Sequence, residues 1–193
     1  MHEIGKLSVI EAIHQRRSVR DFTPKEVERE TVRKLLEAAV RAPSASNRQP
    51  WAFAVIQDRG VLAEYSAEIK ASFPRSSENE RFELQYREML GFPNFNVFYN
   101  AGTLVVVYAH GPAPGLLEEC CFAAENLMLA ACDLGLGTCP IGFARPWFDL
   151  PATKAQLGIP SQYEVVLPIV VGYPAALPPE TERRDPEILV WKR

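Results

Sequence analysis

The segment Thr103–Ala109 is a continuous apolar run rich in β-branched residues. A strand with one solvated face would alternate apolar and polar side chains, so this run predicts a central strand that is buried on both faces. Residues Glu164–Gly172 form a second run of this kind, although Pro168 weakens its middle. Because helical patterns are interspersed with these strands, the sequence predicts a layered α/β or α+β domain.

Helical patterns surround the two runs. Ser8 and Glu11 match a capping box, which predicts a helix that continues to about Gln15, with Ile10 and Ile13 on its apolar face. Further helices are expected at 26–42, 61–72 and 116–134, with a strongly charged one at 78–90. The remaining expected elements are a strand at 51–57, a glycine-rich loop at 135–142 and a short terminal strand at 188–191.

The segment Gly91–Asn100 is rich in aromatic residues, which stand among proline and asparagine. A solvated loop gains nothing from so many rings. We therefore expect this segment to cover a pocket or an interface.

The composition is that of a soluble globular chain. Its 193 residues suit one domain, and 47% are hydrophobic and 23% charged. The 21 basic and 24 acidic residues give a net charge of −3, which argues against a nucleic acid or an anionic membrane as partner. The N-terminus lacks a secretion signal, and no apolar stretch approaches the roughly 20 residues that span a bilayer, so a cytoplasmic location is expected.

Metal and nucleophilic chemistry have little support in the sequence. The four cysteines form no C-x-x-C pair and the three histidines lie far from them, so no metal site is expected. Cys120, Cys121 and Cys132 fall in an apolar helical pattern and are expected to fill the core, whereas Cys139 falls in the glycine-rich loop and is the cysteine to test for reactivity. No G-x-S-x-G or H-E-x-x-H motif is present, and no motif supplies a partner for His110.

Four polar clusters carry the candidate chemistry. The segment Arg16–Arg20 gathers three guanidiniums and a hydroxyl, which suits a phosphate, and its alternative is a solvated basic turn. The loop Pro43–Trp51 either reads the polar edge of a heterocycle or is an ordinary helix-to-strand connection. The glycines of 135–142 permit close approach to a planar ligand but lack a G-x-G-x-x-G fingerprint, and Arg183 and Arg184 alone indicate a solvated tail.

Together these segments resemble the nitroreductase family of FMN-dependent oxidoreductases, from about Val9 to the C-terminus. The likeness is carried by A-I-H-Q-R-R-S-V-R-D-F at 12–22, L-L-E-A-A-V-R-A-P-S-A-S-N-R-Q-P-W at 35–51, A-A-C-D-L-G-L-G-T-C-P-I-G at 130–142 and V-G-Y-P at 171–174. The resemblance implies an α+β fold of three α/β/α layers, whose central mixed, mostly antiparallel sheet is flanked by helices. It also implies a homodimer with two FMN sites at the subunit interface, where the helix 116–134 would be the dimer core.

The resemblance further implies one FMN-binding domain over 1–193. Residues 73–100 would be its variable, often lid-forming segment. Residues 174–193 would be a C-terminal arm whose last residues reach onto the partner's sheet. Nothing about the choice of substrate carries over from this variable segment.

Site residues follow from the resemblance position by position. The first flavin motif matches Arg16, Arg17, Ser18 and Arg20, of which Arg16 and Ser18 would hold the phosphate and ribityl end and Arg20 would approach the pyrimidine side of the ring. The loop that the partner subunit lays against the flavin matches Pro43, Ser44, Ala45 and Asn47, with Gln49 close by. The loop beside the isoalloxazine matches Pro140, Ile141 and Gly142. A second phosphate contact matches Arg184, for which Arg183 could substitute.

The implied activity is a hydride transfer from NAD(P)H to N5 of a tightly bound FMN, and from there to a flat electron-poor acceptor such as a nitroaromatic or a quinone. One pocket used twice gives ping-pong kinetics, and no catalytic side chain is expected because the flavin carries the chemistry. The chain departs from longer family members, which often carry a glutamate where Ile141 stands. Two alternatives stay open: an FMN-storing or partner-binding protein without turnover, and another family chemistry such as reductive dehalogenation.

Overall fold

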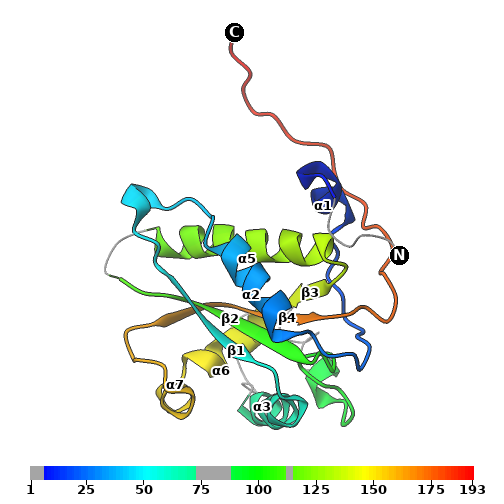
Figure 1. Cartoon of the computed structure of the whole chain (residues 1–193), viewed down its shortest axis with the longest axis vertical. Coiled ribbons are helices and arrows are strands. Elements are labelled where there is room, and N and C mark those ends of the chain that lie inside the picture. The colour runs from blue at the N-terminus through cyan, green and yellow to red at the C-terminus, as the bar shows by residue number, and fades with distance from the viewer. Residues whose placement is uncertain (1–6, 73–87, 112–114) are drawn as a thin grey trace.

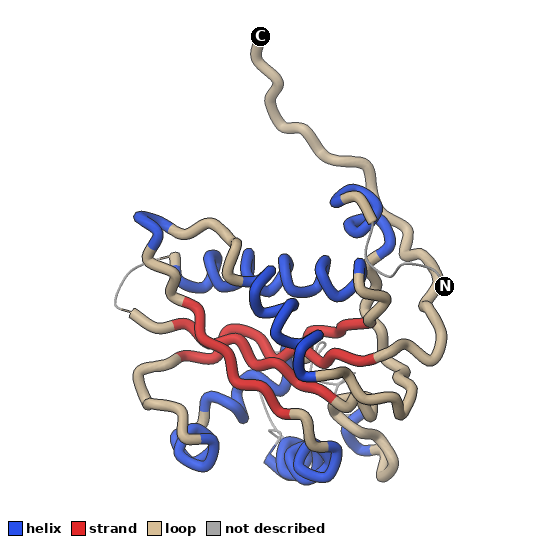
Figure 2. Tube along the Cα trace, in the orientation of Figure 1, coloured by secondary structure: helices blue, strands red, loops and turns tan. Residues whose placement is uncertain are grey.

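The chain folds around one antiparallel sheet with helices on both faces, as a computed structural model shows for residues 7–72, 88–111 and 115–193 (Figure 1). The strands are β1 (Trp51–Ile56), β2 (Thr103–Ala109), β3 (Gly137–Pro140) and β4 (Glu164–Gly172), in the order β1-β2-β4-β3. Figure 2 shows the sheet lying between two layers of helix. This is the three-layer α+β arrangement expected from the sequence, and a parallel bridge between Ser18 and Thr138 makes the sheet mixed at the β3 edge.

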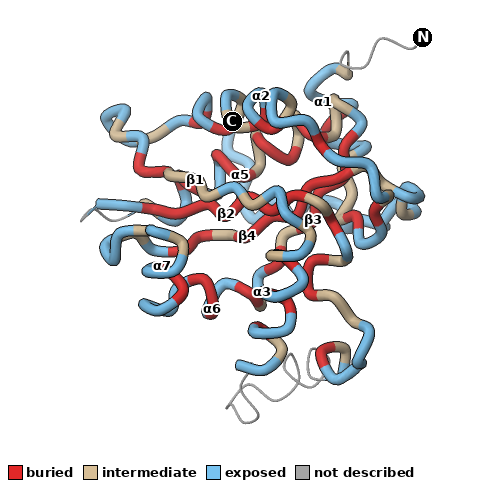
Figure 3. The backbone as a smooth tube through the Cα atoms, turned by 60° about the horizontal axis from the view of Figure 1, so that its bottom comes forward, coloured by how far each residue is buried: buried red, intermediate tan, exposed pale blue. Residues whose placement is uncertain are grey.

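Strand β2 is buried along its whole length, which confirms the prediction for Thr103–Ala109. Leu104, Val106 and Tyr108 pack into the cluster on the side of α3 (Arg59–Ser72) and α6 (Arg145–Asp149). Val105 and Val107 pack into the cluster on the side of α2 (Arg29–Ala39) and α5 (Leu116–Asp133). Figure 3 shows the middle of the sheet as buried backbone, because each face of β2 has its own apolar layer.

Strand β4 begins and ends where the sequence predicted, despite Pro168 in its middle. The carbonyl oxygen of Pro168 accepts a hydrogen bond of 2.8 Å from the N–H of Ile141. In a hydrogen-bonded antiparallel pair the N–H of residue 168 would also donate to the carbonyl oxygen of Ile141, and proline has no N–H to donate. Ile141 already lies beyond the end of β3. The proline therefore interrupts no continuing ladder.

Three helices match their predictions within two residues: α1 (Val9–Gln15), α3 (Arg59–Ser72) and α5 (Leu116–Asp133). The capping box of α1 is present, since Ser8 N–H donates to Glu11 Oε2 at 2.7 Å and Glu11 N–H donates to Ser8 Oγ at 3.2 Å. The expected apolar face of α1 is solvent-exposed in the single chain, with Ile10 at 63% and Ile13 at 51% exposure.

Helix α2 (Arg29–Ala39) is three residues shorter at each end than the expected span of 26–42. After Ala39 the chain tightens into turns in which Arg41 N–H bonds Ala38 O and Ala42 N–H bonds Ala39 O, and Pro43 follows. The helices α6 (Arg145–Asp149) and α7 (Pro151–Leu157) were not predicted. Each is too short to display a repeating apolar stripe.

The expected loop at 135–142 is wrong in its middle, because Gly137–Pro140 form strand β3. On one side β3 pairs with β4, and on the other Thr138 O accepts a 2.9 Å hydrogen bond from the N–H of Val19. A Cβ at Gly137 would lie 2.6 Å from Cγ2 of Val19, so only glycine permits this approach.

The C-terminal arm leaves the body beside α1 and points away from it (Figure 1). The expected strand at 188–191 does not form in this single chain. Its side chains are exposed, with Leu189 at 86% and Trp191 at 72%. A strand needs a neighbouring strand to bond to, and the arm has none here.

The aromatic segment 91–100 divides between core and surface. Phe98 is fully buried with its ring centroid 6.3 Å from that of Phe148, whereas Phe92 is 65% exposed. Part of the aromatic content therefore fills the core. Of the charged helix expected at 78–90, only residues 88–90 lie among the described residues, and these are helical. Within the described part of the chain, no helix is long and apolar enough to cross a membrane.

Candidate functional site

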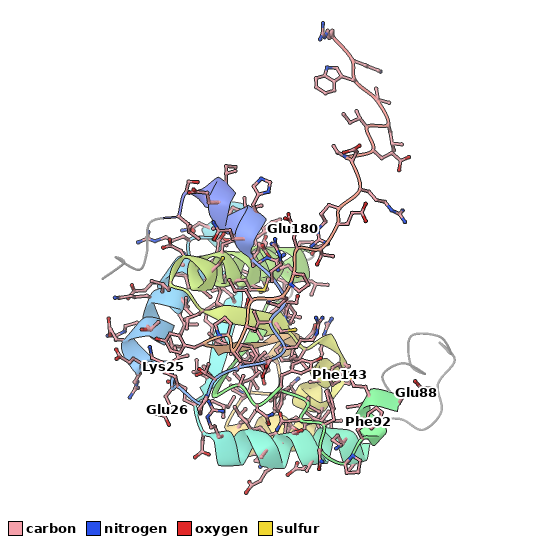
Figure 4. All side chains as sticks on the ribbon, turned by 90° about the vertical axis from the view of Figure 1, so that its right-hand side faces the viewer. Lys25, Glu26, Glu88, Phe92, Phe143 and Glu180 are labelled. Carbon is pink, nitrogen blue, oxygen red and sulfur yellow. The ribbon has the colours of Figure 1, made fainter. Side chains whose placement is uncertain are left out.

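A basic cleft lies where the segment after α1 meets the C-terminal arm. It has a volume of about 510 Å³, and its lining residues are Arg16, Arg17, Ser18, Arg20, Pro178, Pro179, Thr181 and Arg183. Figure 4 looks onto the side from which the arm leaves, with Glu180 of the arm above Phe143, the residue that follows Gly142. The fold thus brings together two of the arginine clusters that the sequence singled out. Guanidiniums around a hydroxyl form a site for an anion such as a phosphate.

Two of these arginines are already held by neighbouring groups. Nε of Arg16 lies 3.3 Å from Oε1 of Glu125 on α5. The guanidinium of Arg17 donates to the carbonyl oxygens of His14 and Arg16, and Nη2 lies 3.7 Å from Oε1 of Glu180. These contacts reduce the side-chain freedom that an incoming anion would otherwise have to freeze.

The segment 16–20 is fixed beside β3 by its backbone. Helix α1 ends because Arg16 leaves the helical region with ψ 132°. The extended chain then forms a parallel bridge from Ser18 to Thr138, and Val19, only 2% exposed, packs into the core. The motif at 12–22 is therefore hydrogen-bonded directly to the motif at 130–142.

The residues Pro140, Ile141 and Gly142 lie at the end of β3, on this same edge of the sheet. The side chain of Ile141 is 1% exposed and belongs to the core, so any ligand contact at this position comes from its backbone. Gly142 is exposed, and a Cβ there would meet nothing within 4 Å. A planar ligand could approach the backbone at Gly142 closely.

The loop 43–49 has an unusual backbone. Ser46, Asn47 and Gln49 take positive φ values of 52°, 55° and 46°. Non-glycine residues seldom adopt this left-handed region, and they keep it only when their surroundings hold them there. Ser44 Oγ accepts a 3.0 Å hydrogen bond from Gln49 N–H, and Gln49 Nε2 lies 3.2 Å from Asn47 Oδ1. Donors and acceptors from three side chains are thereby gathered on an exposed turn.

This loop and the basic cleft are separate in one chain. The loop is anchored at Glu119 near the start of α5, whereas Arg16 of the cleft contacts Glu125, nearly two turns further along that helix. At 1.5 Å per residue these two anchors are roughly 9 Å apart along the helix, and no residue of 43–49 lines the cleft. The structure therefore brings Arg16–Arg20 together with Pro140–Gly142 and Arg183, but not with Pro43–Gln49.

Arg48 and Glu119 are the residues that sequence reasoning missed. Arg48 donates from Nε to Glu119 Oε2 at 2.8 Å and from Nη2 to Oε1 at 2.7 Å, and Ala45 N–H donates to Oε1 at 3.0 Å. The hydrogen bonds from Arg48 lower the pKa of Glu119 from its ordinary value, against the opposing effect of burial. Two adjacent acids, Glu118 and Glu119, at the start of a largely apolar helix were the available signal, but the partner of Glu119, 71 residues away, gave none.

The structure also shows where three other candidates from the sequence lie, namely Arg184, Cys139 and His110. Arg184 is exposed and is not among the residues that line the cleft. Cys139 is not in a loop but in β3, where burial raises the pKa of its thiol, so it is a poor nucleophile. His110 packs against Tyr163 with ring centroids 4.9 Å apart and ring planes tilted by 41°.

Across residues 7–72, 88–111 and 115–193, no group of three or more histidine, cysteine or acidic side chains could hold a metal ion. The cysteines that the sequence assigned to the core differ in burial: Cys120 is buried, Cys132 partly buried and Cys121 exposed. Burial raises the pKa of the Cys120 thiol to about 12. What the site offers is anion binding and close backbone approach.

Comparison with known proteins identifies the family. The model described as "Nitroreductase family" matches residues 13–173, which is most of the chain. The chain belongs to the nitroreductase family. The resemblance drawn from the motifs at 12–22, 35–51 and 130–142 is thereby confirmed.

The similarity of this nitroreductase-family chain to individual proteins extends over nearly its full length. A provisionally named NADH dehydrogenase/NAD(P)H nitroreductase of Archaeoglobus fulgidus is 32% identical over 170 residues, covering 86% of this chain and 84% of that protein. An iodotyrosine deiodinase of Thermotoga neapolitana is 29% identical, covering 89% of this chain and 91% of that protein. The solved structure of a nitroreductase with bound FMN from Bacteroides fragilis has a TM-score of 0.83 at 29% identity, covering 97% of this chain and all of that one.

Proposed function

We propose that this protein is an FMN-dependent oxidoreductase that takes electrons from NAD(P)H and passes them to a flat, electron-poor acceptor such as a nitroaromatic or a quinone. The observation that carries the proposal is the basic cleft beside β3, in a chain of the nitroreductase family. Related chains named for NAD(P)H and nitro compounds, and a solved relative with FMN, support it.

The residues of the cleft fit the phosphate end of FMN. A phosphate monoester carries close to two negative charges, which matches paired guanidinium forks and a hydroxyl donor. Arg16, Arg17 and Ser18 supply these donors from one segment, and Arg183 adds a fourth group from the arm. When bound, FMN supplies the hydride-accepting and hydride-donating chemistry that no side chain provides.

The chain's own residues bind and orient. Arg20 lines the same cleft as Arg16, and its guanidinium would stabilise negative charge at the pyrimidine side of the ring. The backbone at Pro140–Gly142 would lie against the ring system, where the glycine leaves room for a flat molecule. No acid or base among the side chains is needed for the transfer, and the described part of the site offers no obvious dyad.

The site is completed by a second copy of the chain. No residue of the loop 43–49 lines the cleft of its own subunit, so its polar groups would contact the cofactor held by the partner. Apolar side chains that a dimer would cover are exposed, namely Val9, Ile10, Ile13, Leu117, Phe122, Leu177, Ile188, Leu189, Val190 and Trp191. So much exposed apolar surface is typical of an interface.

The arm would end on the partner's sheet. One edge of the sheet, at β3, is covered by the bridge from Ser18, whereas β1 has no strand on its outer side among the described residues. A groove of about 770 Å³ runs between α2 and this edge, with Arg29, Arg33 and Val55 in its lining. The segment 187–191, with one acidic and four apolar residues, would suit this groove as an added strand. Deletion of 186–193 should then weaken the dimer, seen in light scattering as a larger monomer fraction at low protein concentration.

The test of function is reduction of the FMN-loaded protein under anaerobic conditions. NADH or NADPH should bleach the flavin absorbance, and a nitroaromatic or quinone should restore it, with parallel double-reciprocal lines in steady state. An FMN-loaded protein that neither nucleotide reduces would remove the donor assignment and leave storage of FMN. Release of halide from a halogenated phenol at a higher kcat/KM than any nitroaromatic or quinone would favour the dehalogenation seen in the name of the Thermotoga relative.

A cytoplasmic location and a single domain over 1–193 stay predictions.

A further inference from the structure

Glu119 is a buried charge with no role in the flavin contacts described above. It is 7% exposed and lies in the first turn of α5, next to the buried Cys120. A carboxylate taken out of water is costly unless donors replace the water. Here three N–H groups do so, two from Arg48 and one from Ala45.

The two residues that donate to Glu119 stand on either side of two of the three loop residues at positive φ. Ser46 and Asn47 lie between Ala45 and Arg48, and Gln49 follows Arg48 directly. A chain released from these contacts would relax toward ordinary backbone conformations, because the left-handed region is unfavourable for side chains with a Cβ. The Glu119 carboxylate therefore holds both ends of the strained turn at once.

The turn that is held in this way presents ligand-binding groups. Asn47 and Gln49 bring their amides within 3.2 Å of each other, and both residues are exposed. Their exposure together with the fixed backbone beneath them is typical of a preorganised binding loop, which spends less of its binding energy on ordering.

We propose that Glu119 is a positioning residue that sets the FMN affinity of the opposite site in the dimer, by holding the loop 43–49 in its ligand-ready shape through Arg48 and Ala45. This inference rests on the proposed function. It assigns Glu119 a role in the partner's site and none in the cleft of its own subunit. The loop acts in trans, so the two roles can be separated by experiment.

The first measurement is the FMN dissociation constant of the Glu119→Gln variant. The amide keeps the size of the side chain but loses the charge and presents N–H groups to a guanidinium. We expect FMN to bind at least about tenfold more weakly, a size typical of losing a charge-assisted hydrogen bond. Glu118→Gln, at the exposed neighbour in the same helical turn, is the matched control and should bind FMN as wild type does.

The second measurement distinguishes positioning from general destabilisation. The experiment uses a heterodimer of a Glu119→Gln chain and an Arg16→Glu chain. One of its two sites is normal, because the intact cleft of the Glu119→Gln chain meets the intact loop of the Arg16→Glu chain. If Glu119 acts through the loop, this heterodimer binds one FMN with wild-type affinity. If Glu119 instead only stabilises its own subunit, the intact cleft belongs to the destabilised Glu119→Gln chain. Tight FMN binding then does not return.

The outcomes separate this inference from the function on which it rests. Wild-type affinity in the Glu119→Gln homodimer, or failure of the heterodimer to regain tight binding, overturns the positioning role while leaving FMN enzymology intact. A wild-type protein that binds no FMN overturns both. Should Glu119→Gln not fold, Arg48→Lys carries the same expectation, since an ammonium keeps the charge but cannot bridge both oxygens.

Discussion

Val19 fills the space that a side chain at Gly137 would need. A Cβ on Gly137 would lie 2.6 Å from Cγ2 and 2.8 Å from Cβ of Val19, and the N–H of Val19 bonds the carbonyl of Thr138 at 2.9 Å. This contact seats the arginine segment against the edge of the sheet. The anion cleft therefore depends on a glycine that is not among its lining residues.

Gly137→Ala should lower the free energy of unfolding by about 1–3 kcal/mol, as overpacking in a filled core does. It should also weaken FMN binding, because Val19 and the neighbouring Ser18 must shift. Denaturant titration and FMN titration measure the two effects. Gly91→Ala is the control, since a Cβ there meets nothing within 4 Å. Adding Val19→Ala to Gly137→Ala should recover FMN affinity, and no recovery would argue against the packing explanation.

Arg183 and Arg184 should differ, although they are neighbours. Arg183 lines the basic cleft, whereas Arg184 does not. Arg183→Ala should therefore weaken FMN binding by roughly 1.5–3 kcal/mol, the size of a hydrogen bond to a charged group, and Arg184→Ala by much less. The resemblance alone assigns the contact to Arg184, so the reverse ranking in an FMN titration would favour the family pattern over the geometry.

Lys70 should govern the aromatic segment 91–99. Its Nζ donates to the carbonyl oxygens of Phe92, Pro93 and Phe95 at 2.9, 3.2 and 3.2 Å. In Lys70→Met these carbonyls lose their donor, so amide hydrogen exchange in 92–99 should accelerate. If the segment borders the acceptor pocket, the KM for the acceptor should rise while the rate of flavin reduction by NAD(P)H stays unchanged. Lys34→Met, on the exposed side of α2, is the control.

Asp149 should make the fold sensitive to acid. Burial by itself would raise the pKa of Asp149, but hydrogen bonds from Lys154 Nζ at 2.7 Å and Val165 N–H at 3.2 Å leave it below the ordinary 3.8. The carboxylate therefore stabilises the fold above pH 3.8, and that contribution is lost as the pH falls through the lowered pKa. Asp149→Asn should lose stability at neutral pH and show a flatter acid dependence in denaturant titrations. The exposed Glu164→Gln should behave as wild type.

The parts of the fold that the sequence predicted are those with a local pattern. β2 and β4 are unbroken apolar runs, and the α1 capping box lies within four residues, so each element carries its own signal. The arginine segment 16–20 was also predicted. Its three guanidiniums are unusually close together for an acidic chain, and the segment matches a family motif.

The parts that could not be predicted depend on contacts between distant residues. β3 has four residues that include glycine and proline, and it is a strand because β4 and Val19 lie on either side of it. The Arg48–Glu119 pair joins residues 71 apart, and neither residue type predicts its partner. The strand expected at 188–191 needs a neighbour that a single chain lacks.

In the proposed dimer, one FMN is held by the arginine cleft of one chain and the loop 43–49 of the other. The most direct test mixes two defective chains, Arg16→Glu in the cleft and Asn47→Ala in the loop, with different affinity tags, and counts FMN in the purified heterodimer. Each homodimer should bind FMN weakly at both sites. We expect one tightly bound FMN per heterodimer, at the site built from the intact cleft of one chain and the intact loop of the other. A heterodimer that binds FMN no more tightly than the two parent homodimers would contradict a site shared between two chains.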